Sequence, residues 1–275
     1  DYVLTLATDE KSLDVEGWVT LNNRSGATYT NAQLKLVAGD VNIVQPDRFR
    51  GRGDVTEFAM AKAMAPPMRE ESFAEYHLYS LARRTTIKQN QSKQVSLLSA
   101  AEVKVNKVYE FRGNLSYYSR VVPQFEKENA SVFLVFQNEK ENQLGMPLPG
   151  GIMRVYQADS EGMLQFAGED RLQHTPKDEE VKLRLGKAFD IMGERKQTDH
   201  KTLNSRTYES EFEIVIRNHK ESAIVVDVVE PMSGDWDIIS ASKKHEKKDA
   251  NTAIFRLEVP VDGESKLTYR VRVTY

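Results

Sequence analysis

The chain has 275 residues, of which 40% are hydrophobic and 29% charged, so it can build a core and keep a polar surface. Its 38 Lys and Arg residues and 41 Asp and Glu residues give a formal net charge of -3, whereas a dedicated nucleic-acid-binding protein is usually basic. Cysteine is absent, which excludes disulfides, cysteine zinc sites, iron–sulfur clusters and thiol nucleophiles.

The apolar runs of the chain are too short for a membrane span. The longest cover residues 132–136 and 223–226, whereas a spanning helix needs about 20 predominantly apolar residues. Residues 1–6 lack the basic start and long apolar stretch of a signal peptide, and they alternate like a strand. Because the chain opens inside a predicted strand, we expect it to be a processed product or a fragment.

Apolar residues recur at every second position along most of the chain, which is the period of a β-strand. Turn signals rich in Gly, Pro, Asn and Ser separate these segments at the short spacing typical of a sandwich or barrel. Residues 132–136 are apolar at every position, so we expect both faces of that strand to be buried. The predicted strands of the first part run around residues 13–21, 34–36, 76–81, 103–105, 132–136, 152–156 and 181–185.

The last quarter of the chain repeats the strand pattern more tightly. This spacing fits a small immunoglobulin-like or fibronectin-like sandwich. The predicted strands there run around residues 212–216, 223–229, 236–239, 254–259 and 267–275. We therefore expect an all-β protein with a larger β-sandwich region over residues 1–195, a polar linker over residues 194–206, and an immunoglobulin-like β-sandwich over residues 205–275.

One segment, residues 46–68, lacks strand periodicity and forms a long insertion at about residues 46–70. Its Ala and Met residues favour a helix, which Pro66 and Pro67 would end. A long irregular loop fits the segment equally well, since loops beyond about 12–15 residues are usually functional or disordered. The sequence leaves these two structures open.

Several segments, in order along the chain, resemble the bacterial DUF4139 family. They are residues 17–26, which read Gly-Trp-Val-Thr-Leu-Asn-Asn-Arg-Ser-Gly, and residues 29–32, 34–42, 76–79, 86–97 and 174–190. The resemblance implies a longer parent protein with a signal peptide and an upstream β-rich region. It also implies export to the periplasm, the outer cell surface or the extracellular space. It implies no activity, and no catalytic residue carries over from it.

The five histidines do not form a recognisable metal motif. The closest approach is His245 to Asp249, where Asp249 stands in place of the second His that a zinc protease needs. Asp235 and Asp237 offer two carboxylates, whereas calcium takes about 6–8 oxygen ligands. We therefore assign no catalytic, cofactor-binding or metal-ligating residue and expect no cofactor.

A polar cluster at Glu75, His77 and Tyr79 is open to two interpretations. Alternate residues of a strand share one face, so these three side chains would form an acid/base or ligand-binding cluster. The alternative is a half-buried structural histidine with a satisfied hydrogen bond. His174, in a turn before Thr175 and Pro176, is expected to be structural.

Two other short motifs have ordinary explanations. Residues 51–54 contain an integrin-type Arg-Gly-Asp tripeptide, which arises often by chance. Residues 243–248 are rich in lysine without interleaved aromatics, so we expect a charged loop that keeps a sheet edge soluble.

The function expected from this pattern is a non-enzymatic structural or interaction module of the cell envelope or extracellular space. Such a module acts through β-sandwich surfaces and edge strands, where a partner strand can add by backbone hydrogen bonds. The first strand and the last, which ends at Tyr275, are the expected edges. The partner would be a protein, an envelope polymer or a second copy in a homo-oligomer or filament; neither nucleic acid nor a membrane span is expected.

The alternative function is a hydrolase with an unrecognised site that acts on glycans or peptides. Its site would lie around residues 75–79, with residues 46–68 as a lid. That reading requires a concave pocket that gathers Glu75, His77, His174 and a second carboxylate. The interaction reading requires an unpaired sheet edge or an exposed apolar patch.

Overall fold

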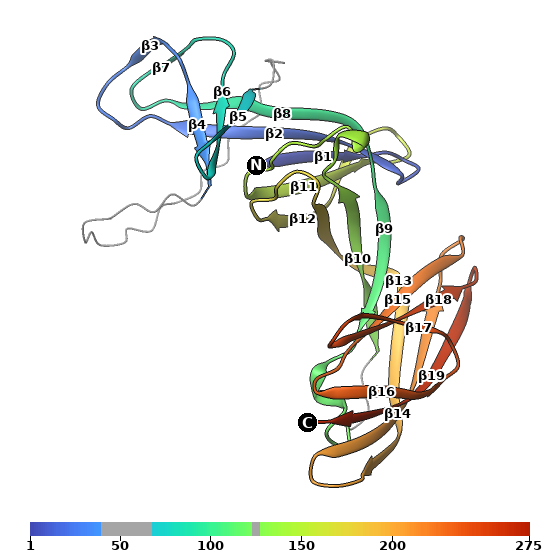
Figure 1. Ribbon diagram of the computed structural model, residues 1–275. Coiled ribbons are helices and arrows are strands. Elements are labelled where there is room, and N and C mark those ends of the chain that lie inside the picture. The colour runs from blue at the N-terminus through green and yellow to red at the C-terminus, as the bar shows by residue number, and fades with distance from the viewer. Residues whose placement is uncertain (40–67, 123–126) are drawn as a thin grey trace. The chain divides into compact units, whose positions relative to one another are not determined.

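The computed structural model describes residues 1–39, 68–122 and 127–275 (Figure 1). Strands account for 66% of the structure and helix for 2%, which confirms the predicted all-β sandwich fold. The insertion predicted at residues 46–70 lies outside the described residues up to residue 67, as does the Arg-Gly-Asp tripeptide at residues 52–54.

The described chain divides into two compact units, each built from two separate segments. Unit 1 comprises Asp1–Val105 and Phe136–Val181, and unit 2 comprises Asn106–Val135 and Lys182–Tyr275. This division differs from the predicted domains of residues 1–195 and 205–275. The predicted linker at residues 194–206 is instead the second half of strand β13 (Glu180–Thr202) and the turn that follows it. The polar residues of this segment form ion pairs with nearby strands, such as that between Asp199 and Arg270 on β19 (Gly263–Thr274).

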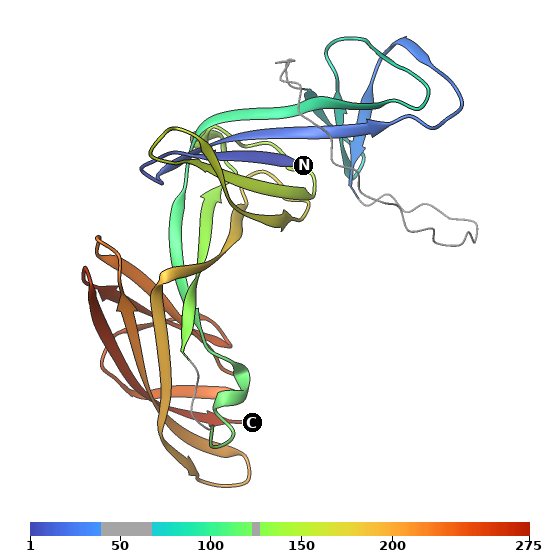
Figure 2. The same ribbon diagram turned by 180° about the vertical axis from the view of Figure 1, so that it is seen from behind.

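Unit 1 is organised around a five-stranded sheet with the order β12-β11-β1-β2-β8. Its strands are β1 (Tyr2–Leu6), β2 (Ser12–Asn22), β8 (Ser92–Lys104), β11 (Gly151–Ala158) and β12 (Leu164–Leu172). Strand β1 pairs in parallel with β11 and antiparallel with β2, so the first strand lies inside the sheet (Figures 1 and 2). The expectation that it forms an exposed edge was therefore wrong.

Side-chain alternation explains which face of this sheet is buried. Tyr2, Leu4 and Leu6 of β1 are buried, whereas the residues between them are only half-buried. Gly17 of β2 is required by close packing, since a Cβ atom there would meet Leu98 Cγ at 2.9 Å. The sheet therefore buries one face in the core of unit 1.

Two small sheets complete unit 1. A three-stranded sheet has the order β4-β6-β5, and a two-stranded sheet pairs β3 with β7. Their strands are β3 (Tyr29–Ala32), β4 (Lys35–Ala38), β5 (Arg69–Phe73), β6 (Tyr76–Ser80) and β7 (Thr85–Ile87), and a 3-10 turn, η2, covers Lys140–Asn142.

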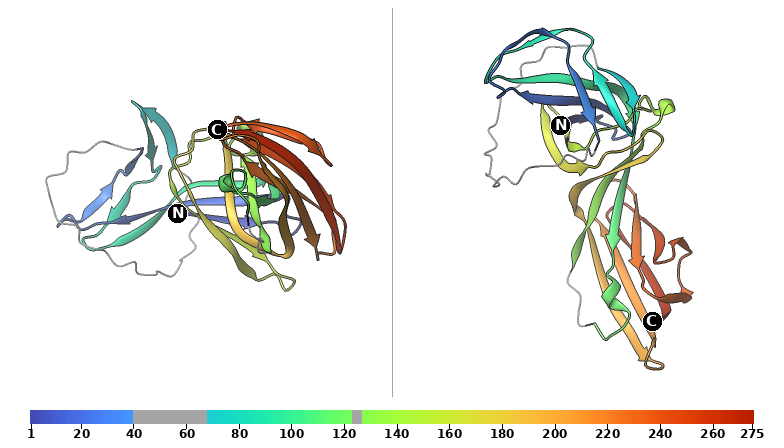
Figure 3. Two further views of the ribbon diagram at one scale, coloured as in Figure 1. Left: turned by 90° about the horizontal axis from the view of Figure 1, so that it is seen from below. Right: turned by 60° about the vertical axis from the view of Figure 1, so that its left-hand side comes forward.

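Unit 2 is built on a nine-stranded sheet with the order β16-β19-β14-β13-β10-β9-β15-β18-β17. Strands β18 and β19 stand far apart in this order and yet contact each other, so the sheet curves over itself into two facing layers (Figure 3). Besides β13, its strands are β9 (Asn106–Arg112), β10 (Glu128–Gln137), β14 (Thr207–Asn218), β15 (Ile224–Pro231), β16 (Asp235–Ala241), β17 (His245–Asp249), β18 (Thr252–Val259) and β19 (Gly263–Thr274), with a 3-10 turn, η1, at Leu115–Tyr117. The last strand, β19, lies between β16 and β14, so the expectation of an edge there was also wrong.

The core of unit 2 is aromatic where the two layers meet. Tyr269 of β19 stacks on Phe212 of β14 with ring centroids 5.4 Å apart and on Phe255 of β18 at 5.2 Å. All three side chains are buried. Because β18 belongs to the opposite layer, these stacked rings hold the two layers together.

Strand β10 departs from its predicted burial. Val132, Leu134 and Phe136 are buried, but Phe133 and Val135 between them are only half-buried. The ammonium of Lys182 lies 4.2 Å from the centre of the Phe133 ring. On the second face of the strand, Phe133 is therefore covered by a lysine side chain rather than by a core.

A buried ion pair crosses the core of unit 2. The guanidinium of Arg195 on β13 donates to Glu230 on β15, and both side chains are almost fully buried. Tyr118 Oη donates a further hydrogen bond of 2.7 Å to Glu230. Burial opposes the charge of Arg195, but Glu230 together with the Tyr269 and Tyr118 hydroxyls outweighs burial and raises the pKa of the guanidinium.

Aromatic rings and glycine backbone surround this pair. The guanidinium of Arg195 lies 5.0 Å from the ring centre of Phe111 and 5.2 Å from that of Tyr117. A Cβ atom at Gly113 would come within 2.3 Å of a Glu230 oxygen. The ion pair is thus closely packed by aromatic rings and by the backbone of Gly113.

We predict that Glu230→Gln destabilises unit 2 by about 3–5 kcal/mol, because it leaves the Arg195 charge buried without its partner. The measurement is urea unfolding in a Trp18→Phe background, where Trp236 alone reports on unit 2. Arg272→Ala, which removes a half-exposed ion pair with Glu209, should cost no more than about 1 kcal/mol. Equal effects of the two substitutions would contradict this assignment.

The lowered pKa of Glu110 on β9 leads us to predict that the stability of the fold depends on pH. Burial raises its pKa, but hydrogen bonds from Lys182 and Arg112 outweigh burial and lower the pKa below the usual value. A lowered pKa stabilises the folded state above the unfolded-state pKa, and this stabilisation is lost as the pH falls through the folded-state value. Glu110→Gln should therefore be less stable than the unsubstituted chain at neutral pH, and the difference should shrink below about pH 4. Urea unfolding at a series of pH values measures this difference in stability. A difference that does not depend on pH would refute the prediction.

Candidate functional site

The predicted cluster of Glu75, His77 and Tyr79 lines one hollow in unit 1. His174 lines the same hollow, which has a volume of about 180 Å³. The structure therefore brings these side chains together with a histidine nearly one hundred residues further along the chain, although Glu75 lies in the turn before β6 and not on the strand face predicted for it.

Strand pairing supplies a second carboxylate behind the hollow. On β5, Glu70 lies opposite Tyr79 of β6, which places it diagonally next to His77. Glu70 Oε1 lies 2.9 Å from His77 Nδ1. A carboxylate only accepts hydrogen bonds, so Nδ1 carries the proton and, in the neutral ring, Nε2 is left as an acceptor.

Tyr79 is a structural wall of the hollow. It is only 2% exposed, and its hydroxyl donates a 2.7 Å hydrogen bond to the carbonyl of Pro147. Burial, and then the nearby Glu70 carboxylate, raise the pKa of this phenol. Tyr79 therefore stays protonated and is not an acid or base of the site.

The opposite wall consists of two proline-containing segments, residues 147–149 and 174–176. Leu148 and Thr175 join them, since each backbone N–H donates to the carbonyl of the other at 2.8 and 3.0 Å. The backbone N–H of Gly150 donates to His174 Nδ1 at 3.1 Å. In the neutral ring of His174, Nε2 therefore carries the proton.

These contacts limit the chemistry of the hollow. Among the residues that the structure describes, Thr175 is the only lining side chain with an aliphatic hydroxyl, and that hydroxyl donates to the carbonyl of Gln173 at 3.0 Å. Within residues 1–39, 68–122 and 127–275, no three His, Asp or Glu side chains are arranged to hold a metal ion. The hollow thus offers hydrogen-bonding groups but no activated nucleophile among its lining side chains.

Sequence reasoning missed Glu70 and the proline wall. Glu70 is recognisable only once β5 pairs with β6, because nothing in its neighbourhood along the chain marks it. The proline-rich stretch at residues 147–151 was interpreted as a turn. Its prolines, which recur beside His174, were the available signal for a rigid wall.

The remaining sequence candidates have structural roles. Trp236 is buried, and its Nε1 donates to the carbonyl of Ala250 at 2.7 Å, while Asp237 lies opposite Arg272. Residues 245–249, expected to be part of a loop, form edge strand β17, and all five of its side chains are exposed.

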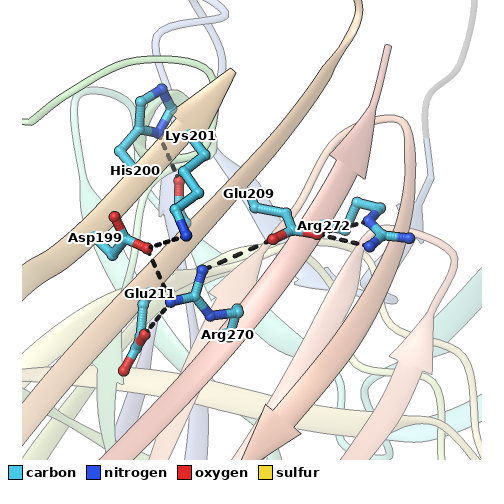
Figure 4. A network of polar contacts seen from close by, with 8 residues as sticks. Asp199, His200, Lys201, Glu209, Glu211, Arg270 and Arg272 are labelled. Atoms are coloured by element: carbon cyan, nitrogen blue, oxygen red, sulfur yellow. Dashed lines mark hydrogen bonds and ion pairs between the residues drawn. The ribbon is translucent and has the colours of Figure 1, made fainter. Parts of the chain in front are cut away.

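One face of unit 2 carries a network of paired charges (Figure 4). Arg270 donates to Asp199 at 2.9 Å and also to Glu211, and Arg272 donates to Glu209 at 2.7 Å. The hydrogen bond from Arg270 lowers the pKa of Asp199. Because these charges neutralise one another across β13, β14 and β19, this network is not a surface for nucleic acid or other anions.

An apolar patch lies at the outer strand of the five-stranded sheet. Met163, Leu164 and Phe166 are 62%, 55% and 57% exposed, and the last two belong to β12. The ring of Tyr156 on β11 contacts Phe166 edge to face, with centroids 5.8 Å apart. We call Met163, Leu164 and Phe166 the β12 patch.

The other edges of the two large sheets are better protected. On β8, the backbone N–H of Met68 donates to Leu97 at 3.1 Å, and Asn142 bonds both backbone groups of Lys104. Strand β16 has a register shift between Ile238 and Ser240, and β17 is charged throughout. Charges and irregularities of this kind discourage strand addition, so the start of β12 is the most open of these edges.

Comparison with known proteins found no family model that matches the chain. No curated protein matches it either. The resemblance to the DUF4139 family therefore stays a prediction. Among the described residues, the helical turns are all too short and too polar to cross a membrane.

Proposed function

We propose that this chain is a non-enzymatic interaction module that pairs with a second copy of itself through the edge of β12. The observation that carries the proposal is the β12 patch, in which two large apolar side chains of the outer strand itself, Leu164 and Phe166, are more than half exposed. Exposed apolar groups on an open edge favour the addition of a further strand, because backbone hydrogen bonds and side-chain burial then act together.

Self-pairing is supported by the order of residues in β12. In a two-fold antiparallel arrangement centred on Gln165, Leu164 of one copy lies opposite Phe166 of the other, and the reverse pair forms by symmetry. Two aromatic–aliphatic pairs would then cover four exposed side chains. Cross-strand pairs of this kind contribute about 0.2–1 kcal/mol each, so we expect a weak dimer that depends on concentration.

The expected setting of this module, outside the cytoplasm, rests on the family resemblance alone. It is part of the proposal, and fractionation of cells that express the full natural protein tests it. The requirement for the alternative, a hydrolase, is met only in part. Glu75, His77 and His174 line the hollow, but the second carboxylate, Glu70, lies behind it and is bonded to His77, so among the described residues Glu75 is the one carboxylate in the lining.

Sedimentation velocity over a concentration series tests the pairing. The unsubstituted chain should shift from monomer to dimer, and Phe166→Lys should stay monomeric. The matched control is Phe189→Lys, since Phe189 is 92% exposed but lies on β13. A chain that is monomeric at all concentrations, or a dimer that Phe189→Lys also abolishes, would overturn the proposal.

A mixing experiment tests the register of the pairing. Leu164→Glu and Phe166→Lys should each be monomeric alone. When the two variants are mixed, the introduced carboxylate of one copy faces the introduced ammonium of the other, and the native pair of Phe166 with Leu164 forms on the other side of the two-fold axis. Dimer should therefore reappear only in the mixture, and its absence there would reject the register centred on Gln165.

A further inference from the structure

The hollow in unit 1 has hydrogen-bonding groups that pairing through β12 does not use. Its lining includes His77, His174 and Glu75, which the fold brings together from β6 and the turns beside it. The hollow is smaller than the about 300–1,000 Å³ typical of a small-molecule site, so one ring-sized group fits it better than an extended chain.

The protonation of each histidine follows from its structural partner. Glu70 holds the proton of His77 on Nδ1, so Nε2 of the neutral ring is an acceptor. Gly150 donates to His174 Nδ1, so Nε2 of that ring is a donor. The carboxylate of Glu75 adds a further acceptor.

This set of groups selects among ligand classes. An anion would face the Glu75 carboxylate, the nearby Glu70 carboxylate and the lone pair on His77. A cation would leave the His174 donor without an acceptor. A hydroxyl group both donates and accepts, and therefore matches all three groups.

The apolar part of the lining supports the same ligand class. Pro147, Pro149 and Pro176 present aliphatic ring surface beside the polar groups. A sugar ring combines a rim of hydroxyl groups with faces made of C–H bonds. Sites of this kind combine apolar surface with a few polar groups that fix the orientation of the ligand.

We propose that this hollow binds a single sugar residue of a neutral glycan. His77 and Glu75 accept hydrogen bonds from its hydroxyl groups, and His174 donates one. Glu70 is a positioning residue, because it sets the tautomer of His77 and thereby makes Nε2 an acceptor. The site is separate from the β12 patch, so it can be tested in the monomeric Phe166→Lys variant.

The experiment is a titration of the full chain, with ¹⁵N-labelled histidine rings, using maltose and cellobiose as neutral sugars and glucuronate as the anionic comparison. The Nε2 resonances of His77 and His174 should shift with at least one neutral disaccharide and respond less to glucuronate. His219 is the internal control, because it also lies near a carboxylate, with Nδ1 3.5 Å from Asp262, but outside the hollow. No shift at His77 and His174, an equal shift at His219, or a stronger response to glucuronate would overturn the proposal.

Glu70→Lys tests the role of the carboxylate. The ammonium of Lys only donates hydrogen bonds and cannot accept the Nδ1 proton of His77, so the ring proton moves to Nε2 and the acceptor becomes a donor. The ¹⁵N shifts of the ring report this change directly in the absence of sugar. Affinity for the neutral sugar should fall about tenfold, the equivalent of one hydrogen bond, whereas His219→Ala should leave it unchanged. A switched tautomer with unchanged affinity would rule out His77 as a ligand contact.

Discussion

The buried ion pair between Arg195 and Glu230 constrains the core of unit 2, because the loss of either partner would leave a charge buried alone. A charged pair is costly to bury, and its attraction repays that cost best where further hydrogen bonds satisfy both groups. Here Tyr118 donates to Glu230 and aromatic rings flank the guanidinium, whereas Arg195 Nε is buried and has no hydrogen-bond partner among the described residues. Because Arg195 and Glu230 lie on β13 and β15, the pair specifies which strands approach each other across the core.

Charges outside the core form ion pairs that remain exposed to solvent. The acidic and basic residues of β13, β14 and β19 pair across neighbouring strands and stay in contact with solvent. This explains why a strand of 23 residues was predicted to be a polar linker in its second half. A polar strand whose charged residues pair with those of adjacent strands has the same composition as a linker. Only its pairing with neighbouring strands distinguishes such a strand from a linker.

Local alternation predicted the strands well, and long-range pairing could not be predicted. Most strands of the two large sheets follow from apolar residues at every second position. The position of β1 inside its sheet does not, because its parallel partner β11 begins at Gly151, far along the chain. The hollow shows the same division: the strand face with His77 and Tyr79 could be predicted, but Glu70 and the proline wall come from other segments.

Neither unit is a continuous stretch of chain, and this has a consequence for biosynthesis. Strand β1 leaves the ribosome long before β11 and cannot gain its parallel neighbour until β11 has been made, and unit 2 cannot close until β19 has emerged. Contacts between such distant segments slow folding, because long loops must be closed first. The edge of β1 that pairs with β11 must therefore stay open while residues 7–150 are translated, and a chaperone that shields strand edges would act on it during that interval.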